Sequence, residues 1–212
     1  MNRRSGGLTW TVALALLAGA AIQPAAAQTG MAGDAAGPAD LILRNGRILD
    51  GAGNPWFRGD VAIRGERIVA VGDLGDLEAV RELDVSGLYV APGFIDVHSH
   101  AGGGLATPEL SHARPLLAQG VTTVVVNPDG GGPVDLAAQR GALEADGLGV
   151  NVAQMVPHGS VRRAVMGTED RFAGPEELEE MAALVRTGME EGAWGLSSGP
   201  FYVPGSYSDT RE

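Results

Sequence analysis

Between residues 89 and 197, short apolar segments alternate with longer amphipathic ones, and this alternation limits the possible folds more than any other feature. The apolar segments have the length and β-branched content of buried strands, and they span 89–97, 121–126, 150–156 and 193–197. The segments between them have the spacing and end signals of helices, and they span 108–119, 134–146 and 175–191. Strands separated by helices form parallel sheets with right-handed crossovers. The sequence therefore predicts an α/β fold for this part of the chain.

Four strands of this kind make up half of an eight-stranded (β/α)8 barrel. No closing strand follows before Glu212, so we expect a barrel that is truncated at the C-terminus and exposes an unpaired sheet edge. A complete open α/β domain is the alternative, but the run Gly102-Gly103-Gly104 after the first strand lacks the G-x-G-x-x-G spacing of a dinucleotide-binding turn. The predicted fold class is thus α/β, the N-terminal half of a (β/α)8 (TIM-type) barrel over residues 91–212.

A small β module is predicted before the barrel, over residues 41–90. Strand-like runs at 41–44, 47–49, 60–64, 67–71 and 82–85 are interrupted by turn residues. Two of these interruptions, Asn45-Gly46 and Arg64-Gly65-Glu66, are typical of tight turns between antiparallel strands. We therefore expect a small antiparallel sheet, as part of a β-sandwich segment.

The first 27 residues have the order of a secretory signal peptide. Arg3 and Arg4 precede an apolar stretch from Leu8 to Ile22, and small residues follow up to Ala27. That stretch is about 15 residues long, shorter than the roughly 20 that span a bilayer, so a retained anchor is the less favoured alternative. Residues 28–40 are rich in small residues and predict a flexible leader. We expect an exported protein, periplasmic or extracellular, without a stable membrane anchor after cleavage.

Composition narrows the chemistry that the chain can perform. The 212 residues include no cysteine, all 15 basic residues are arginine, and the formal net charge is -11. Without cysteine, a metal ion must be held by His, Asp or Glu. Without lysine, the chain can form neither a Schiff base nor a lysine-derived metal bridge. The negative charge disfavours broad contact with nucleic acid and leaves a small molecule as the expected partner.

Two histidines follow the first predicted strand of the barrel. Residues i and i+2 share one face of an extended strand, so His98 and His100 are expected to point their imidazoles at one place. Two neutral imidazole nitrogens suit a borderline divalent ion such as zinc. Active sites of parallel barrels lie at the carboxyl ends of strands, which favours a metal site over two unremarkable histidines. Asp96 is interpreted as orienting this loop through hydrogen bonds.

The run from Pro92 to His100 resembles the opening signature of the amidohydrolase superfamily, and residues 40–51 are similar to the N-terminal β segment of those enzymes. The runs from Gly120 to Val126 and from Gly195 to Tyr207 resemble the D-aminoacylase branch, the N-acyl-D-amino-acid deacylases. The resemblance covers roughly residues 40–212. It implies a barrel with one or two divalent metals, with zinc expected, and hydrolysis of N-acyl-D-amino acids to a carboxylate and a D-amino acid.

The same resemblance suggests further site residues. The family has a metal-binding cysteine after the second strand, and Asp129 occupies the matching position by its spacing from Gly120. A carboxylate can ligate the same kinds of ion, so Asp129 is the third candidate ligand, and an ordinary turn aspartate is the alternative. The resemblance makes His158 a hydrogen-bonding residue near the substrate carbonyl or near the residues that surround the metal ligands, with helix capping or packing as its alternative. Tyr202 is a candidate hydroxyl donor to the substrate carboxylate, and Ser197 a candidate residue of the substrate-binding loop with Ser198.

Other site residues of the family fall outside the sequence. The resemblance implies a general-base aspartate after the eighth strand and two more metal-binding histidines from the fifth and sixth strands. No catalytic residue is therefore predicted in this chain, and we do not expect turnover by it alone. Arg162 and Arg163 are candidate clamps for a substrate carboxylate, with solvent-exposed arginines as the alternative. Two other functions remain open: a cyclic-amide hydrolase of the dihydroorotase or hydantoinase type, and an exported binding module without catalysis.

Overall fold

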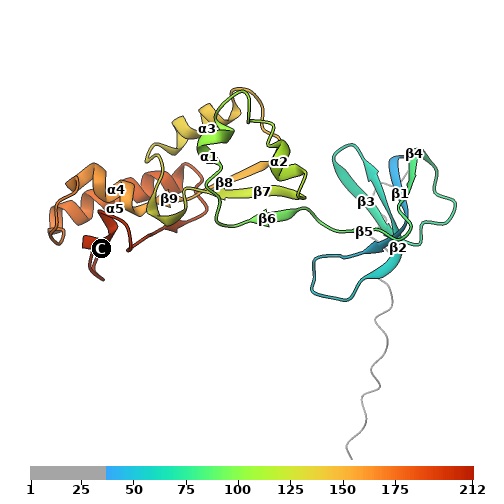
Figure 1. The fold of residues 1–212 in the computed structure, drawn as a ribbon, viewed down its shortest axis with the longest axis horizontal. Coiled ribbons are helices and arrows are strands. Elements are labelled where there is room, and N and C mark those ends of the chain that lie inside the picture. Colours follow the sequence, from blue (N-terminus) through green and yellow to red (C-terminus); the bar gives the residue numbers. More distant parts are fainter. Residues whose placement is uncertain (1–36) are drawn as a thin grey trace, which may run out of the picture. The chain divides into compact units, whose positions relative to one another are not determined.

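The computed structural model describes residues 37–212, so the predicted signal peptide and most of the predicted leader lie outside the described residues. The described residues divide into two compact units, 37–91 and Pro92–Glu212 (Figure 1). The division lies one residue from the predicted start of the barrel segment. Within the described part, the helices are all too short or too polar to cross a membrane.

The first unit is a single sheet in the order β3-β2-β1-β4, with β5 also paired to β1. Its strands are β1 (Ala39–Ile48), β2 (Phe57–Arg64), β3 (Arg67–Gly72), β4 (Ala79–Asp84) and β5 (Tyr89–Val90). β1, β2 and β3 pair antiparallel, whereas β4 and β5 run parallel to β1. The sheet is therefore mixed, and the prediction of an antiparallel sheet is wrong for β4 and β5.

The first of the two predicted tight turns, Asn45-Gly46, is a β-bulge in the structure. β1 runs through Asn45-Gly46, and its register with β2 shifts between Leu43 and Gly46. Asn45 has a φ of 64°, which asparagine tolerates and a bulged strand can accommodate. The other signal is a true hairpin, in which Gly65 has a φ of 55° between β2 and β3.

The strands of the second unit pair in parallel, as predicted, but they form two sheets instead of one, because the strand predicted at 150–156 is divided into β8 and β9. β6 (Phe94–Asp96), β7 (Val121–Val126) and β8 (Asn151–Gln154) form one sheet in that order. β9 (Val156–Pro157) and β10 (Leu196–Ser197) form the other. The expected strand at 89–97 is wrong as one element, because its two ends form β5 and β6 in different units.

The helices of the second unit fall into two groups. α1 (Gly102–Leu105), α2 (Arg114–Leu117) and α3 (Leu136–Glu144) lie on one face of the three-stranded sheet (Figure 1). They bury Val124 and Val126 of β7. The helix predicted at 108–119 shrinks to α2 because Ala113 has a φ of 50°, which interrupts a right-handed helix.

The other two helices pack beside β9. α4 (His158–Met166) and α5 (Pro175–Glu190) enclose a core that includes Val156, Val161 and Met181. The prediction of α5 is confirmed: Pro175 is its first residue, and the Glu177 carboxylate accepts the Gly174 N–H at 2.8 Å. The sequence did not predict α4. Two short 3-10 turns, η1 (Pro128–Gly130) and η2 (Gly205–Tyr207), complete the unit.

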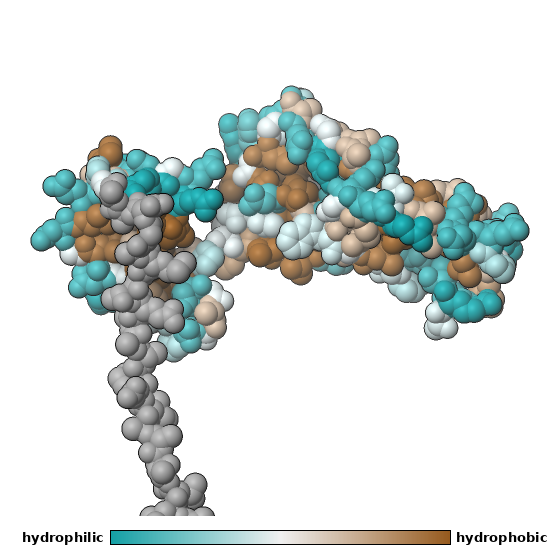
Figure 2. All heavy atoms as spheres, turned by 180° about the vertical axis from the view of Figure 1, so that it is seen from behind, coloured by the Kyte–Doolittle hydropathy of each residue, from teal (hydrophilic) through white to brown (hydrophobic). Residues whose placement is uncertain are grey.

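Apolar side chains reach the surface of the second unit, as the brown areas of Figure 2 show. Three of them belong to or follow β6, an edge strand of its sheet: Phe94, Ile95 and Val97 are 62%, 62% and 74% exposed. An exposed apolar edge strand can pair with another strand, from the same polypeptide or from another one.

Candidate metal centre

The two histidines lie in the turn after β6, which ends at Asp96. Asp96 Oδ1 accepts the backbone N–H of His98 at 3.1 Å, and the N–H of Ser99 donates to Val125 O at 2.9 Å. These bonds tie the turn to the end of β6 and to β7. The rings of His98 and His100 are 5.5 Å apart between centroids. The rings thus come together through the shape of a turn, and not through the strand alternation from which the prediction was made.

Asp129, from the turn after β7, completes a three-residue group. Its Oδ2 lies 3.1 Å from His98 Nε2 and 3.3 Å from His100 Nε2. One donor atom from each residue lies within 4.8 Å of the others. Two donors bound to one tetrahedral zinc ion at about 2.0–2.1 Å lie about 3.3 Å apart. The two distances to Asp129 therefore match those that a shared ion requires, and the group contains the three residues predicted as metal ligands.

The chemistry of the donors also fits a divalent ion. Two imidazole nitrogens and one carboxylate oxygen form a mixed set that suits zinc and similar borderline ions. The side chains of His98, His100 and Asp129 are 58%, 71% and 31% exposed. A small molecule could reach the group from solvent.

The backbone that carries Asp129 has an unusual conformation. Asn127, Asp129 and Gly130 have φ values of 62°, 58° and 71°. The Asn127 amide supports this loop from inside: its Nδ2 donates to Gln139 Oε1 at 2.9 Å and to Met155 O at 3.0 Å. Asp129 thus lies in a Pro-Asp-Gly turn, and its carboxylate also approaches the two imidazoles.

A cavity of about 340 Å³ lies beside the donor group, and its lining includes His100, Asp129, Arg163 and Tyr202. The Arg163 guanidinium donates one bond to Val203 O at 2.9 Å. Of the residues predicted to contact substrate, Tyr202 and Arg163 share this cavity with two of the candidate metal ligands. The Tyr202 hydroxyl and the Arg163 guanidinium therefore lie around the same cavity as two of the candidate metal ligands.

His158 and Ser197 do not line this cavity. His158 Nδ1 lies 3.0 Å from Ser198 Oγ, and its Nε2 lies 2.8 Å from Glu212 Oε1. The Ser197 hydroxyl donates to Asn127 O at 2.5 Å and accepts the Gly130 N–H at 3.1 Å. Both side chains already have protein partners, so their predicted contact with substrate stays a prediction.

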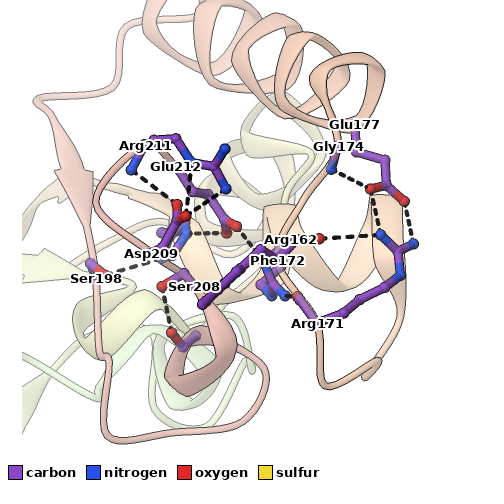
Figure 3. Close-up of polar contacts among 12 residues, drawn as sticks. Arg162, Arg171, Phe172, Gly174, Glu177, Ser198, Ser208, Asp209, Arg211 and Glu212 are labelled. Carbon is purple, nitrogen blue, oxygen red and sulfur yellow. Dashed lines mark hydrogen bonds and ion pairs between the residues drawn. The ribbon is translucent and has the colours of Figure 1, made fainter.

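Arg162 pairs with Glu212, a partner that the sequence did not predict. The Arg162 side chain is fully buried, and its guanidinium contacts the Glu212 carboxylate and donates to Arg171 O at 2.6 Å (Figure 3). The Glu212 side chain is 3% exposed and also contacts His158. Arg162 was a candidate clamp for a substrate carboxylate, but here it binds a carboxylate of the protein itself. The two residues are 50 positions apart, and no local pattern links them.

Comparisons of the sequence and of the structure with known proteins point to the same family. A model of the Amidohydrolase family matches residues 81–204. D-aminoacylase from Alcaligenes xylosoxydans xylosoxydans is 40% identical over 200 residues, which are 82% of this chain and 40% of the relative. A crystal structure of D-aminoacylase is similar with a TM-score of 0.75 and 36% identity, over 82% of this chain and 41% of that one.

A second solved structure is N-acyl-D-glutamate deacylase from Bordetella bronchiseptica, complexed with zinc and a phosphonate inhibitor that mimics the tetrahedral intermediate. It is similar with a TM-score of 0.70 and 33% identity, over 82% of this chain and 41% of that one. The chain thus spans about 40% of the length of these relatives.

Proposed function

Since the chain belongs to the amidohydrolase family, we propose that it supplies part of the active site of an enzyme that hydrolyses N-acyl-D-amino acids to a carboxylate and a D-amino acid. One observation carries this proposal: His98 and His100 place their Nε2 atoms 3.1 and 3.3 Å from Asp129 Oδ2. Similarity to D-aminoacylase and to N-acyl-D-glutamate deacylase supports the class of substrate.

The proposed fold is the N-terminal half of a (β/α)8 barrel. Parallel strands with helices α1 to α3 on one face support it, as does the exposed apolar edge at β6. The candidate ligands follow β6 and β7, at the carboxyl ends of the strands, where barrel enzymes carry their active sites. A second layer against the five-stranded sheet would complete the β-sandwich predicted for the first unit.

The proposed cofactor is a divalent ion, with zinc favoured, held by His98, His100 and Asp129. Such an ion, when bound, polarises an amide carbonyl and brings the pKa of a water molecule near 7. The protein's own groups position the substrate. The Tyr202 hydroxyl donates to the substrate carboxylate, and the Arg163 guanidinium attracts that anion into the same cavity.

We also propose export through the signal peptide of residues 1–27. The order of basic, apolar and small residues in the sequence supports this. N-terminal sequencing of the protein from the periplasm or the medium tests it, with a mature start at Gln28 as the expected result.

An activity assay tests the proposed reaction. The test protein is the chain, or the longer product if the reading frame continues past the Glu212 codon. Its substrates are N-acetyl-D-methionine, N-acetyl-L-methionine and hydantoin, with and without zinc. Zinc-dependent release of methionine from the D-substrate alone is the expected result for the complete enzyme. Cleavage of hydantoin alone indicates a cyclic-amide hydrolase instead, and thermal stabilisation by N-acyl amino acids without turnover by the longer product indicates a binding module.

A further inference from the structure

The Ser197 hydroxyl lies against the backbone of the loop that carries Asp129. It donates to Asn127 O at 2.5 Å and accepts the Gly130 N–H at 3.1 Å. The two contacts bracket Asp129, two residues before it and one after it. A single side chain therefore joins both sides of the turn that presents the third candidate ligand.

This loop needs an external restraint. Asn127 and Asp129 have positive φ values, 62° and 58°, a conformation that Asn and Asp adopt more readily than other residues with a Cβ but that is still less favourable than the right-handed one. Strained backbone of this kind persists only where surrounding contacts determine it. The Ser197 hydroxyl supplies two such contacts from 70 and 67 residues further along the chain.

The strand end that carries Ser197 is itself fixed by a chain of polar contacts, part of which Figure 3 draws. Ser198 lies 3.0 Å from His158 Nδ1, and His158 Nε2 lies 2.8 Å from Glu212. Glu212 in turn contacts the fully buried Arg162. The contacts run from inside the second unit to the residue next to Ser197, so the Ser197 hydroxyl acts from a fixed position.

We propose that Ser197 is a positioning residue for Asp129: its hydroxyl holds the loop so that the carboxylate faces His98 and His100. The inference rests on the metal site proposed above, but it concerns a residue that does not touch the ion. It also gives the Ser197 hydroxyl a different task from the substrate contact predicted from sequence, because its proton and one lone pair are already used by the backbone.

The test compares S197A with wild type and with S206A, which removes an exposed hydroxyl elsewhere in the second unit. Two quantities are measured on the whole chain: hydrogen exchange of the Gly130 amide without metal, and affinity for Zn²⁺ by competition with a chelator. In S197A we expect faster exchange at Gly130, because its acceptor is lost, and an affinity lower by about 10- to 100-fold. S206A should match wild type in both. Unchanged exchange and affinity in a folded S197A protein would overturn the inference.

A second pair of variants covers the case in which S197A does not fold. S197T and S197V have nearly the same shape and differ mainly in the hydroxyl. Protection of Gly130 in S197T and its loss in S197V supports the inference, and equal exchange in the two overturns it. Failure of the proposed metal site is recognised separately: the wild-type chain would then bind no Zn²⁺, while exchange at Gly130 would still report on Ser197.

Discussion

Substitution of Gly199 by alanine should move the Asp129 loop without removing any polar group. A Cβ atom built on Gly199 would lie 2.2 Å from Asp129 O and 2.8 Å from Asp129 C. A carbon and an oxygen in close contact stay about 3.3 Å apart, so the two backbones would have to separate by about 1 Å. The backbone of Gly199 does not have a positive φ, so the predicted effect comes from lack of space and not from an unfavourable backbone conformation.

The size of the effect follows from the geometry of the donor group. Asp129 Oδ2 is shared between two imidazoles at 3.1 and 3.3 Å, so a shift of about 1 Å disturbs both spacings. Binding sites tolerate errors of about 0.5 Å, and loss of support for a ligand lowers metal affinity by about 10- to 100-fold. We expect G199A to lower Zn²⁺ affinity by about 100-fold, which corresponds to about 2.8 kcal/mol.

Chelator competition measures this affinity, and thermal unfolding monitored by circular dichroism shows whether each variant is folded. G131A is the matched control, because it lies in the same loop and its added Cβ would meet nothing closer than Pro128 O at 3.8 Å. The reasoning is refuted if a folded G199A protein binds Zn²⁺ within about threefold of wild type. It is equally refuted if G131A loses as much affinity as G199A.

Three further predictions concern the donor group and the ion pairs. Replacing His98 and His100 together by alanine should abolish Zn²⁺ binding by calorimetry while leaving the melting curve unchanged, because both side chains are exposed; retained binding would place the ion elsewhere. E212A should lower the free energy of unfolding in urea by about 3–5 kcal/mol, because it leaves a buried guanidinium unpaired, and a loss under about 1 kcal/mol would contradict this. Hydrogen bonding to Arg171 lowers the pKa of Glu177 from 4.5 to about 2, so the stability that this group contributes is present above pH 4.5 and is lost as the pH falls toward 2. Acid titrations of wild type and E177Q should therefore differ in that range, and identical curves would contradict the prediction.

The sequence predicted the elements whose signals are local. α5 has proline at its first turn and acidic residues after it, and β7 is an uninterrupted β-branched run. α4 was missed because its sequence, from His158 to Met166, begins with His-Gly-Ser and contains two adjacent arginines. The expected helix at 108–119 contains Pro115 in its interior, a local signal against one continuous helix. α2 accordingly begins at Arg114, with Pro115 in its first turn and Ala113 in a left-handed conformation before it.

The candidate site was predictable where it depends on strand ends. His98, His100 and Asp129 follow neighbouring strands, so their proximity could be argued from topology. The contacts that hold the site in place could not be predicted from strand topology. Asn127 gave a weak signal, because asparagine tolerates a positive φ, but the tasks of Ser197 and Glu212 depend on contacts across 50 or more residues.

The distance along the chain between Ser197 and Asn127 sets an order of events during synthesis. The ribosome completes the loop with Asp129 well before it adds the serine 70 residues after Asn127. Until that serine has left the exit tunnel, the loop lacks the hydroxyl that joins its two sides. On the proposed role of Ser197, nascent chains that stop before this point carry all three donor residues without the contact that positions Asp129.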